Sequence, residues 1–136
     1  MKAYLSRRYR FSASHRLHFD GYSAEQNREV FGKCNNPHGH GHNYVVEATF
    51  GGQVDPVTGM VCDLDALDRF AREQLLDSFD LNNLNTLEVF RDLVPTTENL
   101  AIVVHGIFQK FDGATLENVH VEETGNNSFD FDGGRR

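Results

Sequence analysis

The sequence predicts a single α+β domain, in which an antiparallel sheet of four strands is covered on one face by two helices. Two observations favour this fold class. Several stretches alternate apolar and polar residues, which is the period of a half-buried strand. Two other stretches repeat apolar residues at helical spacing behind a capping residue. The resulting order is strand, strand, strand, helix, helix, strand, which is typical of helices packed on one side of an antiparallel sheet.

The composition is that of one globular domain over residues 1–136, with 39% hydrophobic and 24% charged residues. No window approaches the roughly 18 apolar residues of a membrane span, and the N-terminus lacks the apolar stretch of a secretory signal. We therefore expect no membrane partner. Two cysteines without a disulfide-scaffold pattern favour the cytoplasm. The net charge of -7 argues against general nucleic-acid binding.

The first strand is expected over residues 3–16, where Phe11 and Ala13 alternate with polar neighbours. His15 falls on the same face as these apolar residues. Residues 17–39 are polar and rich in turn formers, so they predict a long loop. A loop of this length inside a compact domain is often functional.

The second strand is expected over residues 40–50, followed by turn residues from Asp55 to Gly59 and a short return strand at Met60-Val61. One face of the second strand is apolar except at its start. By the period of two, that face comprises His40, His42, Tyr44, Val46, Ala48 and Phe50.

Two helices follow. Asp63 is expected to cap a helix over residues 64–77, and Thr96 or Thr97 to cap a second helix that Gly113 ends. The segment between these helices, residues 78–95, is expected to be irregular.

The last strand is expected over residues 115–124, and it places Val119, Val121 and Glu123 on one face. A carboxylate in line with two buried valines needs a hydrogen-bond partner. The tail from Asp130 is expected to be frayed.

The histidines indicate a metal site. Catalytic zinc takes three protein ligands and keeps an open position. His40 and His42 supply two ligands from one strand, and His15 is the best third ligand because it points inward from a neighbouring strand. Zn²⁺ is expected, although three imidazoles also suit other divalent metals. Four histidines compete as candidates, of which we interpret the last two as structural or surface residues: His18, His38, His105 and His120.

Cys34 lies six residues before His40, and Gly39 and Gly41 allow the loop between them to fold back closely. Three interpretations remain open for its thiol. It is a general base whose pKa is lowered by a nearby cation, a fourth zinc ligand in a structural site, or an unreactive free thiol like that of Cys62.

Basic residues are concentrated before the histidine-rich loop, where they form either a solvated surface or a patch for a small anionic ligand. They are Arg7, Arg8, Arg10, Arg16, Arg28 and Lys33.

Motifs along nearly the whole chain resemble the 6-pyruvoyl-tetrahydropterin synthase family. In chain order the matching segments are Phe11-Ser12-Ala13-Ser14-His15-Arg16-Leu17, Cys34-Asn35-Asn36-Pro37 running into His40-Gly41-His42-Asn43-Tyr44, Asp55-Pro56 with Thr58-Gly59-Met60-Val61, Thr96-Thr97-Glu98-Asn99, and Glu123-Thr124 with Asn126-Asn127. In combination these motifs are highly specific.

The resemblance implies a T-fold subunit that oligomerises through its sheet edges into a β-barrel, commonly as a hexamer built from a dimer of trimers. It implies Zn²⁺ on three histidines and 7,8-dihydroneopterin triphosphate as substrate. The enzyme would be a lyase that eliminates triphosphate and tautomerises the substrate side chain. The metal ligands implied are His15, His40 and His42.

The resemblance also assigns roles around the metal. Cys34 would abstract a proton, and Glu123 would anchor the guanidine-like edge of the pterin, whose adjacent N–H groups a buried carboxylate can accept together. The segment of Thr96, Thr97 and Glu98 would help to hold the pterin.

One position departs from the family pattern. Asp80 is expected to act with Cys34, but Leu81 stands where the family usually has a histidine that relays protons. Leucine cannot titrate, so either another histidine such as His38 replaces the relay or the reaction is slower.

Two alternative functions are compatible with the family resemblance. A 6-carboxy-tetrahydropterin synthase of queuosine biosynthesis acts on the same substrate, but its cysteine generally lies closer to the His-Gly-His pair than Cys34 does here. A pterin-binding protein with impaired catalysis would keep the metal and show no turnover.

Overall fold

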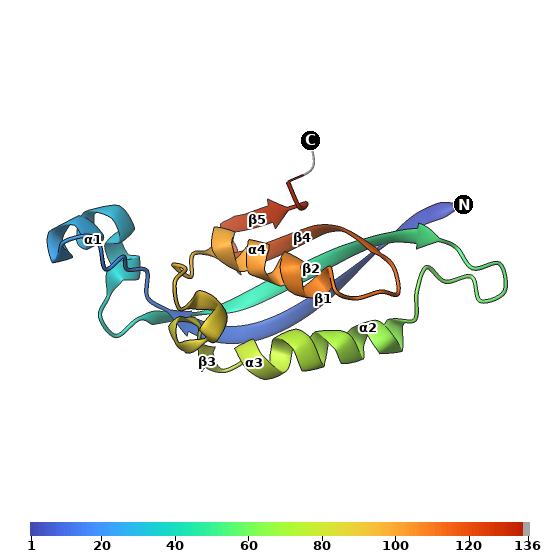
Figure 1. Cartoon of the computed structure of the whole chain (residues 1–136), viewed down its shortest axis with the longest axis horizontal. Coiled ribbons are helices and arrows are strands. Elements are labelled where there is room, and N and C mark those ends of the chain that lie inside the picture. Colours follow the sequence, from blue (N-terminus) through green and yellow to red (C-terminus); the bar gives the residue numbers. More distant parts are fainter. Residues whose placement is uncertain (135–136) are drawn as a thin grey trace.

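The computed structural model, which describes residues 1–134, is an α+β domain with a five-stranded sheet in the order β3-β1-β2-β4-β5 (Figure 1). The strands are β1 (Lys2–His15), β2 (His40–Gln53), β3 (Asn82–Asn83), β4 (Thr115–Thr124) and β5 (Asn127–Phe131). The helices are α1 (Ala24–Phe31), α2 (Leu64–Ala71), α3 (Asp77–Phe79) and α4 (Thr97–Phe108). Within these described residues, no helix is both long and apolar enough to cross a membrane.

The centre of the sheet is the long antiparallel ladder between β1 and β2, which runs from the Lys2–Gln53 pair to the His15–His40 pair. On its other side β2 pairs antiparallel with β4, so that Val46 lies opposite Val121. The three strands expected from alternation over 3–16, 40–50 and 115–124 are confirmed. Because side chains alternate along each strand, one face of the ladder turns towards the helices.

The prediction of a four-stranded sheet was wrong in its details. Met60 and Val61 do not form a strand. They end a turn in which the Asp55 N–H donates to the Met60 carbonyl at 3.0 Å and the Gly59 N–H donates to the Asp55 carbonyl at 2.8 Å. The additional strands are β3, which pairs parallel with β1 over two residues, and β5, which pairs antiparallel with β4. Part of the tail expected to be frayed therefore lies in β5, and residues 135–136 lie outside the described residues.

The predicted first helix is confirmed in position, although its geometry changes along its length. The Asp63 carboxylate caps α2 by accepting from the backbone N–H groups of Asp65 and Ala66. A π-helical turn over Arg72–Leu76 then continues into α3 and keeps Leu75 buried. A wider turn of this kind shifts which residues face the sheet without ending the helix.

Two further elements differ from the predictions. The second predicted helix, α4, is capped by the Thr96 hydroxyl, which accepts from the Asn99 N–H at 3.1 Å, and it ends at Phe108 rather than at Gly113. The predicted loop before the histidines contains α1, whose capping box joins Ser23 and Gln26.

The core lies between the sheet and the face of α2 and α4. The Phe108 ring of α4 stacks at 5.8 Å on Tyr9 of β1 and meets Phe50 of β2 edge-on at 6.2 Å. Burying a side chain of this size stabilises the fold by about 1.5–3 kcal/mol. α4 also packs against β4 and β5, and its first turn lies at the end of the sheet that carries the histidines (Figure 1).

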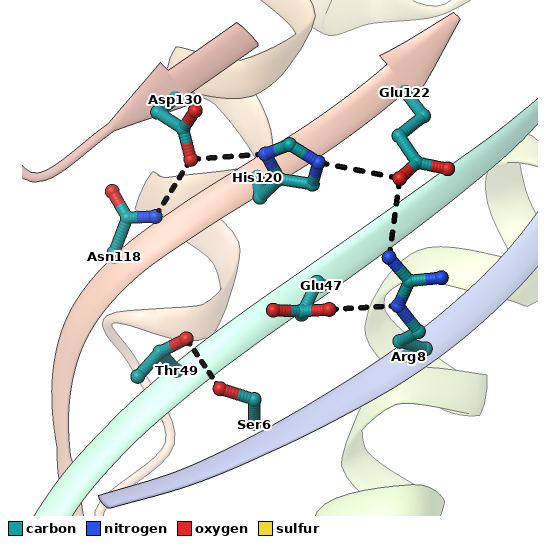
Figure 2. A network of polar contacts seen from close by, with 8 residues as sticks. All are labelled: Ser6, Arg8, Glu47, Thr49, Asn118, His120, Glu122 and Asp130. Atoms are coloured by element: carbon teal, nitrogen blue, oxygen red, sulfur yellow. Dashed lines mark hydrogen bonds and ion pairs between the residues drawn. The ribbon is translucent and has the colours of Figure 1, made fainter. Parts of the chain in front are cut away.

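The opposite face of the sheet is polar and carries a network of paired charges (Figure 2). Arg8 donates to Glu47 at 2.7 Å and to Glu122 at 3.1 Å. His120 lies between Asp130, at 3.0 Å, and Glu122, at 3.4 Å. His120 thus faces away from the buried valines of β4, as expected from the alternation.

Candidate functional site

Three histidines converge where β1 and β2 meet the loop that connects them. His15 ends β1 and pairs directly with His40 at the start of β2, while His42 lies opposite Ala13. The Nε2 atoms of His15 and His40 are 3.1 Å apart, and the ring centroids of the three imidazoles lie 4.7 to 5.1 Å from one another. Since His15 is only 1% exposed, the cluster lies at the edge of the core.

The donor set of this cluster fits a metal ion. One ligand atom from each histidine lies within 4.8 Å of the other two. His42 Nε2 is buried and has no hydrogen-bond partner within the described residues, a state that a buried nitrogen rarely keeps without a ligand. Burial lowers the pKa of His15 and of His42, which favours the neutral imidazole that binds metals.

The orientation of His15 is set by groups behind it. Its Nδ1 lies 2.8 Å from the Pro95 carbonyl oxygen and 3.3 Å from the Tyr44 hydroxyl. With a proton on Nδ1 donated to Pro95, the lone pair of Nε2 points towards His40. A partner of this kind fixes the ring and the tautomer of a metal-binding histidine. The sequence pattern contained no signal for the Pro95 contact, because it depends on where α4 begins.

Glu123 lies near the end of β4, where the pairing with β5 shifts register between Glu122 and Thr124. The Thr97 hydroxyl donates to its carboxylate, and Asn127 Nδ2 donates to the other oxygen at 3.3 Å. Partial burial would raise the pKa of Glu123, but these hydrogen bonds and the nearby His42 and His15 outweigh it, so the pKa lies below its usual value. The carboxylate is therefore held as an anion, and the partner that the sequence required is Thr97.

Cys34 lies in a 3₁₀ turn over Gly32–Asn35 and is half-buried. Its carbonyl accepts from the Leu17 N–H at 2.8 Å, which ties the loop to the end of β1. The metal-ligand cluster found in the described residues contains the three histidines and not Cys34, which argues against a fourth zinc ligand.

The Cys34 thiol interacts electrostatically with Glu123 and with Tyr44. Burial, followed by the negative field of Glu123, raises the pKa of the Cys34 thiol, and Cys34 in turn contributes to raising the pKa of Tyr44, where burial is the main cause. Burial and Glu123 both act in the protein without a metal ion, and they give the thiol a raised pKa instead of the lowered pKa expected from the sequence. That expectation depends on the positive charge of a bound cation.

Asp80 and Leu81 lie beside the last residues of β1, and Leu81 lines one hollow with His42. The Asp80 carboxylate accepts from the Ser12 N–H at 2.9 Å, and the Leu81 N–H donates to the Ser12 carbonyl at 2.6 Å. Within residues 1–134, no hydrogen bond or electrostatic interaction joins Asp80 to Cys34. Leu81 is 84% exposed and has a positive φ of 59°.

The remaining predicted residues lie in the first turn of α4. Thr97 is buried and bonded to Glu123, Thr96 uses its hydroxyl to cap the helix, and Glu98 is exposed to solvent. The competing histidines lie outside the cluster. His18 Nδ1 accepts from Asn35 Nδ2 at 3.0 Å, and His105 is buried in α4 beside Phe131.

Comparison with known proteins agrees with this geometry. Residues 4–134 match the family model described as 6-pyruvoyl tetrahydropterin synthase. The chain is 46% identical over 128 residues to the 6-pyruvoyl tetrahydrobiopterin synthase of Homo sapiens, covering 93% of this chain and 88% of that protein. It is 46% identical over 126 residues to the same enzyme of Poecilia reticulata, covering 91% and 86%.

Solved structures share the fold. The 6-pyruvoyl tetrahydropterin synthase of Caenorhabditis elegans superimposes with a TM-score of 0.93 at 40% identity, covering 98% of this chain and 97% of that one. The enzyme of Plasmodium vivax superimposes with a TM-score of 0.65 at 14% identity, covering 96% and 97%, a likeness that shows the fold alone. Together these matches identify the α+β architecture as the T-fold. The chain belongs to the 6-pyruvoyl tetrahydropterin synthase family.

Proposed function

We propose that this protein is a zinc-dependent lyase that eliminates triphosphate from 7,8-dihydroneopterin triphosphate and tautomerises the side chain of the pterin. The observation that supports this most directly is the shared location of three features. A partly buried histidine triad, an anionic Glu123 and Cys34 all lie at one end of the sheet. The relatives named above carry the corresponding enzyme name.

Glu123 is suited to bind the pterin ring. A pterin presents adjacent N–H donors, and a carboxylate can accept both in a bidentate contact. The Thr97 hydroxyl and the Asn127 amide orient the carboxylate from the protein side. With Glu123 fixed, the ring is held and the substrate side chain extends towards the histidines.

Cys34 is suited to move protons on that side chain. A divalent metal held by His15, His40 and His42 would supply Lewis acidity towards the side-chain hydroxyls. The Cys34 thiolate takes a proton from a side-chain carbon, the bond from carbon to the triphosphate oxygen breaks, and the thiol returns a proton during tautomerisation. A general base of this kind contributes about 10²–10⁴ in rate.

We further propose that the protein is a cytoplasmic homo-oligomer, with a hexamer as its form. Free Cys34 and Cys62 fit a reducing compartment. Both edges of the sheet support assembly, because β5 has no outer neighbour in the described chain and β1 is paired by β3 at only Ala13 and Ser14. Exposed strand edges of this kind readily pair with another chain. Light scattering of the purified protein tests the oligomeric state.

The decisive experiment incubates zinc-loaded protein with 7,8-dihydroneopterin triphosphate and identifies the pterin product by mass, with release of triphosphate measured in parallel. The 6-pyruvoyl product with one triphosphate per turnover supports the proposal. A 6-carboxy product would favour the queuosine enzyme instead. Tight pterin binding without triphosphate release would mean that the chain binds pterin but lacks the relay histidine, as the leucine at position 81 allows.

A further inference from the structure

We infer that a basic groove beside the histidine triad, formed by Arg16, Arg28 and Lys33, binds the triphosphate of the substrate. This inference rests on the proposed function and deepens it. The groove is an open hollow of about 540 Å³ between the end of β1, helix α1 and the 3₁₀ turn that carries Cys34. Its remaining lining residues are His18, Ala24, Gly32, Asn35, Asn36 and Pro37.

The charges of this groove are free to meet an anion. Within residues 1–134, Arg16, Arg28 and Lys33 form no ion pair. By contrast, Arg7 is paired with Asp68, and Arg8 with Glu47 and Glu122. On a chain of net charge -7, three unneutralised cations around one hollow create a local positive field. Such a field attracts a compact polyanion.

The groove is built by hydrogen bonds rather than by chance proximity of surface side chains. Asn35 is buried, and its Nδ2 donates to the Leu17 carbonyl at 2.8 Å. Arg16 Nε donates to the Asn35 carbonyl at 3.3 Å. These bonds fix the wall that carries Arg16 against the wall that carries Lys33.

The position of the groove matches the chemistry. Arg16 directly follows His15 of the triad, and Lys33 directly precedes Cys34. A second hollow of about 500 Å³ shares Arg16, His18 and Pro37 with the groove and extends to Pro95, whose carbonyl contacts His15. A substrate whose side chain lies at the triad can therefore place its terminal phosphates in the groove, and the cations there also stabilise the charge of the departing triphosphate.

The test compares Arg28→Gln and Lys33→Gln with two matched controls, Arg72→Gln and Lys110→Gln. Each variant removes one positive charge from an exposed side chain, so the change in overall charge is the same. The probes are inorganic tripolyphosphate and dihydroneopterin, which separate the phosphate from the pterin. Calorimetry measures their binding to the zinc-loaded protein, and steady-state kinetics gives KM and kcat for the full substrate.

We expect each groove variant to weaken tripolyphosphate binding about tenfold and to raise KM by a similar factor, as the loss of one charged hydrogen bond would do. The double variant should lose about a hundredfold. Binding of dihydroneopterin should stay unchanged in all variants, and the controls should resemble the wild type. Weaker tripolyphosphate binding without a rise in KM would assign the groove to free phosphate rather than to the substrate and overturn the inference.

Other outcomes are equally distinct. Arg28 lies in the last turn of α1, where a cation also stabilises the helix dipole. A variant that lowers the melting temperature but binds tripolyphosphate normally would show that structural role alone and overturn the inference. If the wild type turns over substrate and the groove variants match the controls, the groove inference fails while the proposed function stands. If the wild type yields no product but its tripolyphosphate binding depends on the groove, the proposed function fails and only a phosphate site remains.

Discussion

Replacement of Thr97 by valine tests how the candidate pterin anchor is held. Thr97 is 2% exposed, and its hydroxyl donates to Glu123. Valine keeps the branched shape and removes only the donor, so Glu123 retains a single weaker donor, Asn127 at 3.3 Å. A hydrogen bond to a charged group contributes about 1.5–3 kcal/mol. Since Glu123 is only half-buried, the lower end of this range applies, and we expect the free energy of unfolding to fall by about 1.5 kcal/mol.

Loss of the Thr97 hydroxyl should also weaken pterin binding. If Thr97 orients the carboxylate that receives the pterin, Thr97→Val should weaken dihydroneopterin binding about tenfold, the equivalent of about 1.4 kcal/mol. Thr97→Ser keeps the hydroxyl and should bind within about twofold of the wild type. Urea unfolding gives the stability, and the change of pterin fluorescence on titration gives the affinity.

A matched control separates the two effects. Ser23→Ala removes the cap of α1, which forms no hydrogen bond with Glu123 in the described residues, and should lower stability by about 1 kcal/mol without changing pterin affinity. If Thr97→Val is destabilised but binds dihydroneopterin as tightly as the wild type, Glu123 is not the pterin anchor that this geometry describes. If Ser23→Ala also loses affinity, the loss reflects general destabilisation, and the assignment of Thr97 fails.

Three further predictions concern the metal, the dependence of stability on acid pH, and Leu81, the position that differs from the family pattern. Zinc at about a hundredfold excess over its Kd should stabilise the wild type by about 2.7 kcal/mol, a gain that His42→Asn should remove, as thermal unfolding with and without chelator would show. Hydrogen bonds from Arg7 and Tyr9 hold the pKa of Asp68 below its usual value, so Asp68→Asn should reduce stability by about 0.5 kcal/mol at pH 6, a small figure because the pair is exposed. This difference should shrink as the pH falls below the ordinary pKa of an aspartate towards the lowered pKa of Asp68, which urea unfolding at pH 6 and pH 3 measures; an equal difference at both pH values would contradict it. Leu81→His should raise kcat about tenfold or more and move the pH–rate profile towards acid; an unchanged profile would count against a missing relay.

Most of the sheet and the clustering of the three histidines could be predicted, because both follow from the two-residue period of side chains along a strand. Alternation along β1 and β2 places His15 and His42 on the inward face with Tyr44, and the length of the ladder leaves little freedom in register. The same alternation along β4 predicted that Glu123 lies on the face of Val119 and Val121. His15 alone could have been an ordinary core residue. The two histidines on the neighbouring strand, His40 and His42, made a shared site the better interpretation.

The elements that were missed depend on tertiary neighbours. β5 and β3 are short, and each exists because a longer strand supplies its backbone partners. Helix α1 had a signal in its Ser23–Gln26 capping box, but its weakly apolar sequence resembled a loop. The contact of the Pro95 carbonyl with His15 joins residues 80 positions apart, and no local pattern can reveal such a pairing.

The placement of Leu81 shows why its replacement tests chemistry rather than folding. The backbone there is held by the bonds that join Asp80 and Leu81 to Ser12, and neither bond uses the leucine side chain. Leucine is unfavourable at a φ of 59°, whereas histidine is several times more frequent among residues with positive φ. Because the side chain is exposed, Leu81→His removes no packing. A variant at this position should therefore be at least as stable as the wild type, and any change in its pH–rate profile reports the imidazole itself.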